Sequence, residues 1–322
     1  MSDVLARAPQ SRRAAVAGRR PAPTARGARR ATAIAPYLLV LPVIATMGIA
    51  LGYPLVRQFV MSFQKYGLAQ QFGKAPEWIG LDNYKAIFAD PAVWAVITRS
   101  LLFCVAAAGL TMLVGMAVAV LMTKLVKWLR VVVQSVLLIA WAMPVIASMT
   151  IWQWLFDTNY GVINWLLVKI GLDQFKGHSW LIDPLSFLTI AAIVVVWMSV
   201  PFVAFSLNAA LTQVSGEQLE AAELDGANAW ERFLHIKLPT IMPVVMVVSL
   251  LQVIWDLRVF AQIYYLQQAG GVASETNLLG TYIYNLGLGQ GDFGKAAAVA
   301  IFMLALTLGL TFFYVRKLAK EV

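Results

Sequence analysis

The chain has 322 residues, a formal net charge of +9 and a composition that is 60% hydrophobic but only 13% charged. Soluble domains have about half their residues apolar and about a quarter charged, so this chain has too few polar residues to cover a water-soluble globule. The composition also excludes a disordered or low-complexity chain. The single Cys104 excludes a disulfide framework and a multi-cysteine metal site. The class that remains is a membrane protein.

Most of the excess positive charge lies in residues 1–33, which contain eight arginines and one acidic residue. The segment has no apolar face at any period, which predicts a disordered basic tail whose charge orients the protein. A nucleic-acid-binding arm is an alternative, but no aromatic stacking platform accompanies the arginines. A cleaved signal peptide is disfavoured, because the apolar stretch that follows is too long and lacks a small-residue cleavage site.

Six apolar stretches are long enough to cross a bilayer, which requires roughly 20 helical residues. Aromatic residues near several of their ends, such as Trp94, Trp154 and Tyr314, are typical of a membrane interface. Prolines within the first and fourth stretches, including Pro42 and Pro201, predict bends in those helices. The six predicted spans are 34–59, 99–122, 131–156, 185–207, 240–264 and 295–315.

Basic residues gather on one side of the membrane if the chain crosses it six times. The tail, the connection with Lys124, Lys127 and Arg130, and the terminus with Arg316 all lie on that side. Positive residues favour the cytoplasmic side, so both termini are predicted to be cytoplasmic. An odd number of spans would separate the two basic ends across the membrane.

The connection between the fourth and fifth predicted spans, residues 212–239, is the most acidic part of the chain. Ser215 with Gln218, and Asn228 with Glu231, have the spacing of a capping box at the start of a helix. The connection therefore predicts two short helices.

Glycine and proline are expected to end these two helices. Gly226 suits the C-terminal cap of the first, and Pro239 is expected to stop the second. Apolar residues fall on one face of each helix, for example Trp230 and Phe233 on the second. A simple connector does not need two capped amphipathic helices, so this loop is predicted to present a surface to another protein.

Within this loop, Glu220-Ala221-Ala222 is followed by Gly226 and then by Ile236-x-Leu238-Pro239, and this pattern resembles the EAA loop of ABC-importer permeases. Two further segments, Gly80-Leu81-Asp82-Asn83-Tyr84 and the stretch 292–298, resemble signatures of the carbohydrate permeases of the maltose and glycerol-phosphate type. The resemblance covers everything after about residue 33. The residues of the loop that match the family pattern are Glu220, Ala221, Ala222, Asp225, Gly226, Leu238 and Pro239.

The resemblance implies a mechanical role for this loop. Its first helix would dock on a cytoplasmic ATPase subunit, with Glu220 as the anionic contact and Gly226 as the turn between the two helices. The alternative is that Glu220 is simply a residue on the surface of the helix and Gly226 simply caps that helix. The implied partners are a second homologous permease, two ATPase subunits, an extracytoplasmic solute-binding protein and a carbohydrate substrate. No cofactor is expected on this chain, since ATP and Mg would bind to the partner ATPase.

Sequence motifs for chemistry are missing from the chain. It has no GxxxxGK[ST] phosphate-binding loop and no GxSxG nucleophile elbow. His178 and His235 are the only histidines and lie in different loops, which argues against a metal site. An intramembrane hydrolase is a different-class alternative, but it lacks a nucleophile and base at membrane depth. A channel or scaffold would not need the EAA loop.

Polar residues inside the fifth predicted span suggest a substrate path, because such groups usually face the bundle interior or a watery cavity. Gln252, Trp255, Asp256 and Val259 follow a three- and four-residue spacing that predicts one shared face. Their amide, carboxylate and indole groups suit a carbohydrate. Asp256 could instead pair with a basic residue such as Arg258, and Trp255 could be packing bulk.

The resemblance places the same four residues, together with Met198, Ser199 and Phe202 of the fourth span, where maltose-type permeases line their sugar cavity. The residue types differ from the maltose pattern, and Ala261 and Val272 depart from it after the fifth span. The particular sugar is therefore left open, with glycerol phosphate or another polyol as the alternative cargo.

The sequence thus predicts an all-α membrane protein with six transmembrane helices, a cytoplasmic coupling loop between spans four and five, and no nucleic-acid partner. It would lie in a bacterial cytoplasmic (inner) membrane. The predicted organisation is a disordered basic tail at 1–33, a first span and external loop at 34–97, a type-1 importer core at 98–315 and a cytoplasmic tail at 316–322.

Overall fold

The computed structural model describes residues 39–321, so the predicted basic tail lies outside the described residues. The described residues divide into two units, 39–56 and 57–321. A helix over 39–47, the π-helix η1 (Gly48–Gly52) and helix α2 (Tyr53–Met61) follow one another without a break. Together they make one candidate membrane span, Leu39–Met61, with a mean hydropathy of 2.0. This stretch is the described part of the first predicted span.

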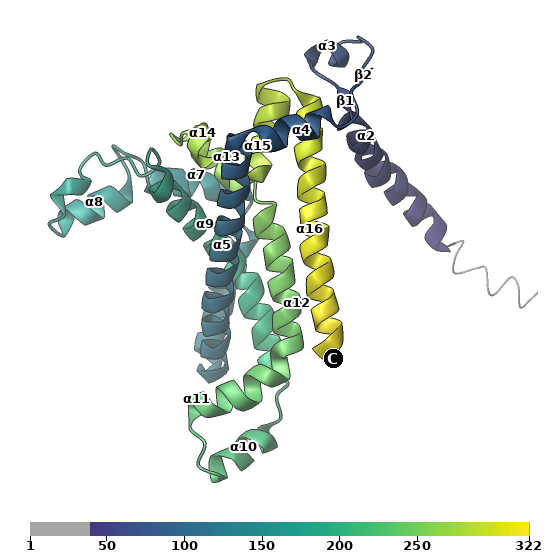
Figure 1. Ribbon diagram of the computed structural model, residues 1–322. Coiled ribbons are helices and arrows are strands. Elements are labelled where there is room, and N and C mark those ends of the chain that lie inside the picture. The colour runs from purple at the N-terminus through teal and green to yellow at the C-terminus, as the bar shows by residue number, and fades with distance from the viewer. Residues whose placement is uncertain (1–38, 322) are drawn as a thin grey trace, which may run out of the picture. The chain divides into compact units, whose positions relative to one another are not determined.

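Four long helices form the body of the second unit (Figure 1). Apolar side chains dominate all four, and each contains a stretch long enough to cross a membrane or is continuous with one. The predicted second, fourth and sixth spans lie wholly inside three of them. The four helices are α5 (Pro91–Lys124), α9 (Pro184–Leu211), α12 (Leu238–Leu257) and α16 (Phe293–Glu321).

Two of these helices begin in the same way, with an aspartate followed by a proline. Asp90 accepts a hydrogen bond from the backbone N–H of Ala92 at 2.9 Å, and Asp183 accepts one from Ser186 at 2.8 Å. The aspartate satisfies a free N–H of the first turn, and the proline has no N–H to leave unsatisfied there. Helix α9 continues without interruption through Pro201.

Helices α5 and α9 approach each other closely at a glycine. A Cβ built on Gly115 would lie 2.5 Å from Cγ1 of Val203, so no larger residue fits at this position. Nearby, Asn208 of α9 donates a hydrogen bond to the backbone carbonyl of Ala119 at 3.1 Å. Small residues that allow close backbone approach and polar side chains that bond across helices are both typical of packing inside a membrane.

The third predicted span, 131–156, is a pair of helices and not one straight helix. Helices α6 (Lys127–Ala142) and α7 (Val145–Leu155) meet at an angle of 100°. Met143 and Pro144 are extended between them, with ψ angles of 130° and 138°. Proline disfavours helical backbone in the residue before it, which explains the break. By length and composition the described residues have five spans, or six if the bent pair counts as one.

Short elements connect the long helices, most of them at the end away from residues 212–239 (Figure 1). Strands β1 and β2 pair antiparallel, with Gln64 opposite Trp78 and Lys65 opposite Glu77. The elements are β1 (Gln64–Lys65), α3 (Leu68–Gln71), β2 (Glu77–Trp78), α4 (Asp82–Ala89), α8 (Val162–Lys169), η2 (Asp173–Phe175), α13 (Ala261–Gln268), α14 (Ala273–Thr276), α15 (Leu279–Tyr284) and η4 (Asn285–Gly289).

The two motifs that supported the family resemblance meet in space around the segment 62–66. The Asn83 amide donates to the backbone carbonyls of Ser62 and Gln64, both at 2.9 Å. The Gly294 N–H donates to the carbonyl of Tyr66 at 2.9 Å. A Cβ on Gly294 would overlap the backbone carbonyl oxygen of Gln64, so only glycine fits there. Both motifs therefore hold the segment that follows α2.

Candidate functional site

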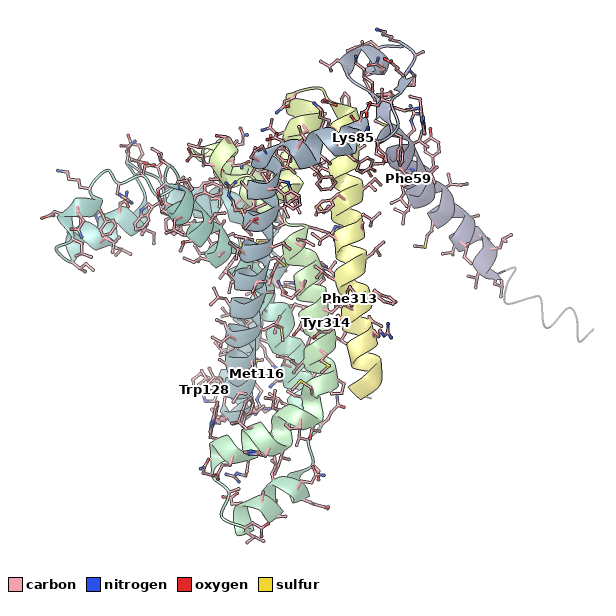
Figure 2. All side chains as sticks on the ribbon, in the orientation of Figure 1. Phe59, Lys85, Met116, Trp128, Phe313 and Tyr314 are labelled. Atoms are coloured by element: carbon pink, nitrogen blue, oxygen red, sulfur yellow. The ribbon has the colours of Figure 1, made fainter. Side chains whose placement is uncertain are left out.

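Two short helices, α10 (Gly216–Leu224) and α11 (Ala229–Arg232), lie in the connection between α9 and α12. We call them the coupling helices. They extend past the ends of α5, α9 and α12, on the same side as the end of α16 (Figure 1). Figure 2 shows Met116 and Trp128 near this end, and Lys85 at the opposite end of the unit. The predicted pair of helices in this loop is confirmed.

Helix α10 ends in a turn that depends on a glycine. Gly226 has φ = +88°, a left-handed conformation that residues with a Cβ rarely adopt. Its N–H bonds to the carbonyl of Glu223 at 3.1 Å, and the N–H of Ala227 bonds to that of Ala222 at 2.9 Å. These two bonds are those of a Schellman motif. The predicted cap at Gly226 is confirmed.

The start of α10 differs from the prediction. Ser215 is the N-cap residue, but its side chain makes no capping hydrogen bond, so the predicted capping box with Gln218 does not form. Glycine follows Ser215 directly, and Glu217 supplies an acidic side chain in the first turn, which favours the positive end of the helix dipole. The helix begins at the predicted place without the predicted bonds.

The start of α11 has the predicted capping box. The Asn228 side chain accepts hydrogen bonds from the N–H groups of Trp230 and Glu231, both at 3.0 Å. The Glu231 carboxylate accepts one in return from the N–H of Asn228 at 2.7 Å. Asn228 therefore fixes the direction in which the chain leaves the turn at Gly226.

The prediction that Pro239 ends the second helix is wrong. Helix α11 passes through the π-helix η3 (Phe233–Lys237) into α12, where Pro239 lies in the first turn. The N–H of Leu238 bonds to the carbonyl of Phe233, five residues earlier. This wider turn accommodates a residue that lacks an N–H and would clash in a regular helix. The coupling helix α11 is thus continuous with a membrane span.

The contact between the two coupling helices includes an ion pair that sequence reasoning missed. Arg232, at the end of α11, donates to the carboxylate of Glu223, near the end of α10. The two residues are nine positions apart with a turn between them, so no local spacing rule relates them. The pair ties α10 to α11 across the Gly226 turn.

The predicted coupling residues occupy two places along this connection. Glu220 and Ala221 are exposed on α10, whereas Ala222 is half-buried. Leu224 is 90% exposed at the end of the same helix, so α10 presents an apolar and an acidic side chain together. Asp225 is the C-cap of α10. Leu238 and Pro239 lie apart from them, at the start of α12.

The predicted substrate residues of α9 and α12 do come together at one point. The rings of Phe202 and Trp255 meet edge-on, with centroids 5.0 Å apart. Met198, one turn before Phe202, receives a hydrogen bond on its sulfur from the Gln262 amide at 3.5 Å. Trp255 is 47% exposed, and Ser199 is half-buried. Gln262 is an addition to the predicted set, reached only because α13 folds back against α9.

The four residues predicted to share one face of the fifth span differ in burial, and Val259 lies beyond the end of α12. Gln252, Asp256 and Val259 are buried, whereas Trp255 is on the surface of the chain. The Gln252 amide donates to Asp256 Oδ1 at 2.9 Å. Asp256 forms no ion pair with Arg258, since the ion pairs found among residues 39–321 involve other groups. Within the described residues, Asp256 Oδ2 and Gln252 Oε1 have no hydrogen-bond partner.

Residues that could support metal chemistry are scattered. No group of three or more histidine, cysteine or acidic side chains that could hold a metal ion occurs in the described part of the chain. Two candidate functional features remain in the described residues. They are the exposed coupling helices and the aromatic contact between α9 and α12.

Residues 111–317 match the family of binding-protein-dependent transport system inner membrane components. The diacetylchitobiose uptake system permease protein DasB of Streptomyces coelicolor is 40% identical over 297 residues, covering 92% of this chain and 90% of that protein. The trehalose/maltose transport system permease protein MalF of Thermococcus litoralis is 30% identical over 282 residues, covering 87% of this chain and 92% of that protein.

A solved structure has the same fold. One chain of a bacterial alginate ABC transporter, in complex with an alginate pentasaccharide-bound periplasmic protein, superposes with a TM-score of 0.75 and 25% identity. The match covers 89% of this chain and 93% of that chain. The all-α fold and the resemblance drawn from the coupling loop are both confirmed, and the chain belongs to the binding-protein-dependent transport system inner membrane components as the permease subunit of an ABC importer whose ATPase is a separate chain.

Proposed function

We propose that this permease forms the translocation path for a sugar or oligosaccharide. Its partners would be a second homologous permease, two cytoplasmic ATPase subunits that bind ATP and Mg, and an extracytoplasmic solute-binding protein. Support for the cargo comes from the relatives, which are named for diacetylchitobiose and for trehalose and maltose, and from a structural neighbour crystallised with an alginate-bound periplasmic protein.

The coupling helices supply the observation on which the proposed mechanism rests. Helix α10 is held by bonds at Gly226, by the Asn228 capping box and by the Arg232–Glu223 ion pair, while Glu220 stays exposed. A helix that is held in a fixed orientation and exposes an acidic and an apolar side chain, here Glu220 and Leu224, suits docking into an ATPase. Since α11 continues into α12, a displacement of α10 is passed to a membrane span.

The proposed substrate path follows the contact between Phe202 and Trp255. Met198 and Ser199 lie on the same stretch of α9 and would line the path with them. An aromatic face with nearby polar groups suits a sugar ring, which has an apolar face and a rim of hydroxyls. Gln252, Asp256 and Val259 lie behind this surface, where they would fix the position of α12.

The topology proposed for the chain follows from the side on which the coupling helices lie. The end of α16 lies on that same side (Figure 1). If the ATPase is cytoplasmic, the C-terminus and the loop with Lys124 and Lys127 are cytoplasmic too, in accord with the positive-inside rule. We retain the proposed division into a tail at 1–33, a first span and outer loop at 34–97, a core at 98–315 and a short end at 316–322.

The coupling role is tested by Gly226→Val in the assembled transporter. Valine disfavours the left-handed conformation at this position, by about 1–2 kcal/mol or more, so α10 would lose its orientation. Sugar uptake in proteoliposomes should fall at least fivefold while ATP hydrolysis continues. The matched control is Gly216→Ala, because Gly216 has no positive φ and its added Cβ would meet nothing within 4 Å. Normal uptake by an assembled Gly226→Val complex would refute the coupling role.

A further inference from the structure

A groove lies between the end of α5 and the coupling helices, with a volume of about 840 Å³. One wall is apolar and comes from α5, between Leu113 and Val120. The opposite wall contains the aromatic side chains of Trp230 and Phe233, whose rings are stacked with centroids 5.8 Å apart. Figure 2 shows Met116, which lines the groove, close to this end of α5.

Three cationic side chains line the same groove. Lys124 comes from the last turn of α5, Arg232 from the end of α11 and Lys237 from the end of η3. No acidic side chain is among the lining residues. Arg232 is partly neutralised by its ion pair with Glu223, but neither lysine has an ion pair among residues 39–316, the part of the chain whose side chains are described. The groove thus has an apolar wall along α5 and an excess of positive charge near the end of that helix.

We infer that this groove binds an anionic phospholipid. The acyl chains would lie along the α5 wall, and the phosphate would accept hydrogen bonds from Lys124 and Lys237. Trp230 would lie at the headgroup level, where tryptophan is commonly found. A zwitterionic lipid carries its own cation next to the phosphate and would gain less from the two lysines. Charge complementarity therefore selects an anionic headgroup over other apolar occupants.

The site would make the coupling helices sensitive to the membrane. Its two walls come from α5 and from the α11–η3 segment, so a bound lipid would bridge a membrane span and a coupling helix. The inference concerns a lipid site and does not depend on the identity of the transported sugar.

The test uses the full-length chain in detergent, titrated with phosphatidylglycerol and separately with phosphatidylcholine, with bound lipid counted by native mass spectrometry. We expect one phosphatidylglycerol per chain to bind at least tenfold more tightly than phosphatidylcholine. Each basic residue near an anionic lipid is worth about a fivefold change in affinity, so Lys124→Gln with Lys237→Gln should weaken binding more than tenfold. Inorganic phosphate at millimolar concentration should not compete, because it lacks acyl chains.

The matched control is Lys127→Gln with Arg316→Gln, which removes two exposed cations from the same side of the unit but outside the groove. This control should change the affinity less than twofold. An equal loss in both double variants, or no preference for phosphatidylglycerol, would overturn the inference.

A second measurement uses the wild-type chain, so its result does not depend on whether a variant folds. A photoactivatable phosphatidylglycerol should label α5 between Leu113 and Val120 in the wild-type chain, both alone and in the assembled transporter. Labelling of the isolated chain only would show that a partner subunit covers the groove, and would overturn the assignment to lipid.

Discussion

The Phe202 ring meets the Trp255 ring edge-on, with their centroids 5.0 Å apart, and this contact joins two helices that are separated in the sequence by the whole coupling connection. Trp255 is 47% exposed despite the contact, so it is available to a substrate. The neighbouring Gln252 and Asp256 are 0% and 3% exposed. The surface of α12 that would face the proposed substrate path is therefore aromatic, whereas the Asp256 carboxylate and the Gln252 amide are buried.

Trp255→Ala should weaken transport without unfolding the protein. The indole ring supplies an aromatic contact worth about 0.5–1.5 kcal/mol, which corresponds to a two- to tenfold loss in the apparent affinity for the sugar. Uptake measured against sugar concentration in proteoliposomes checks this result. Trp128→Ala is the control, because Trp128 is also exposed but lies on α6 near the opposite end of the unit. Equal effects of the two variants would remove Trp255 from the path.

Asp256→Asn should leave the transport KM within about twofold and should not lower the melting temperature. Asparagine keeps an acceptor for the Gln252 amide, and it removes the cost of burying a carboxylate that has no ion pair among the described residues. Thermal unfolding of the purified chain and uptake kinetics provide the two measurements. A large rise in KM with an unchanged melting temperature would instead show that the carboxylate contacts the substrate.

Asn228→Ala should loosen the start of α11. Loss of a capping side chain costs about 1 kcal/mol, and hydrogen exchange at residues 229–233 should accelerate about fivefold. Ser215→Ala is the matched control, because the Ser215 side chain makes no capping bond, and exchange in α10 should not change. Faster exchange in both helices would mean that the two caps contribute alike, contrary to the structure.

Gly115→Val should destabilise the packing of α5 on α9. The added atoms would overlap Val203, and overpacking of this kind costs about 1–3 kcal/mol. Gly109→Ala on the same helix meets nothing within 4 Å and should be neutral or slightly stabilising, since alanine favours a helix over glycine. The melting temperatures of the two purified variants make the comparison. A stable Gly115→Val chain would show that the close approach is not needed.

Local sequence rules predicted some, but not all, of the bonds whose partners are a few residues apart. The Asn228–Glu231 capping box and the Gly226 turn depend on bonds within six residues, and both formed as predicted. The Ser215–Gln218 box has the same spacing and did not form. Spacing shows that such bonds are possible, but other groups in the first turn determine whether they form.

Prolines illustrate a second limit of sequence reasoning. Pro239 was expected to stop a helix, but a π-turn carries the helix past it. Pro144 lies inside the third predicted span, at the point where α6 and α7 meet at an angle of 100°. A proline is accommodated or not according to whether the preceding turn can widen, and this depends on packing against neighbouring helices. Packing against neighbouring helices also determines which side of α12 is buried. The three- and four-residue spacing therefore could not show that Asp256 is buried while Trp255 is exposed.

The helical backbone runs without a break from Ala229 to Leu257, and it would act as a lever between the proposed ATPase-docking end and the proposed substrate path. At a rise of about 1.5 Å per residue, Trp230 and Trp255 are separated by ~38 Å along the axis. A tilt of about 10° at the proposed ATPase-docking end would therefore move the aromatic end by ~7 Å, more than the width of a sugar ring. The π-helix η3 lies between α11 and α12, close to the end with Trp230. A change of one residue in the winding of η3 would therefore alter the tilt of α12 without breaking the helix.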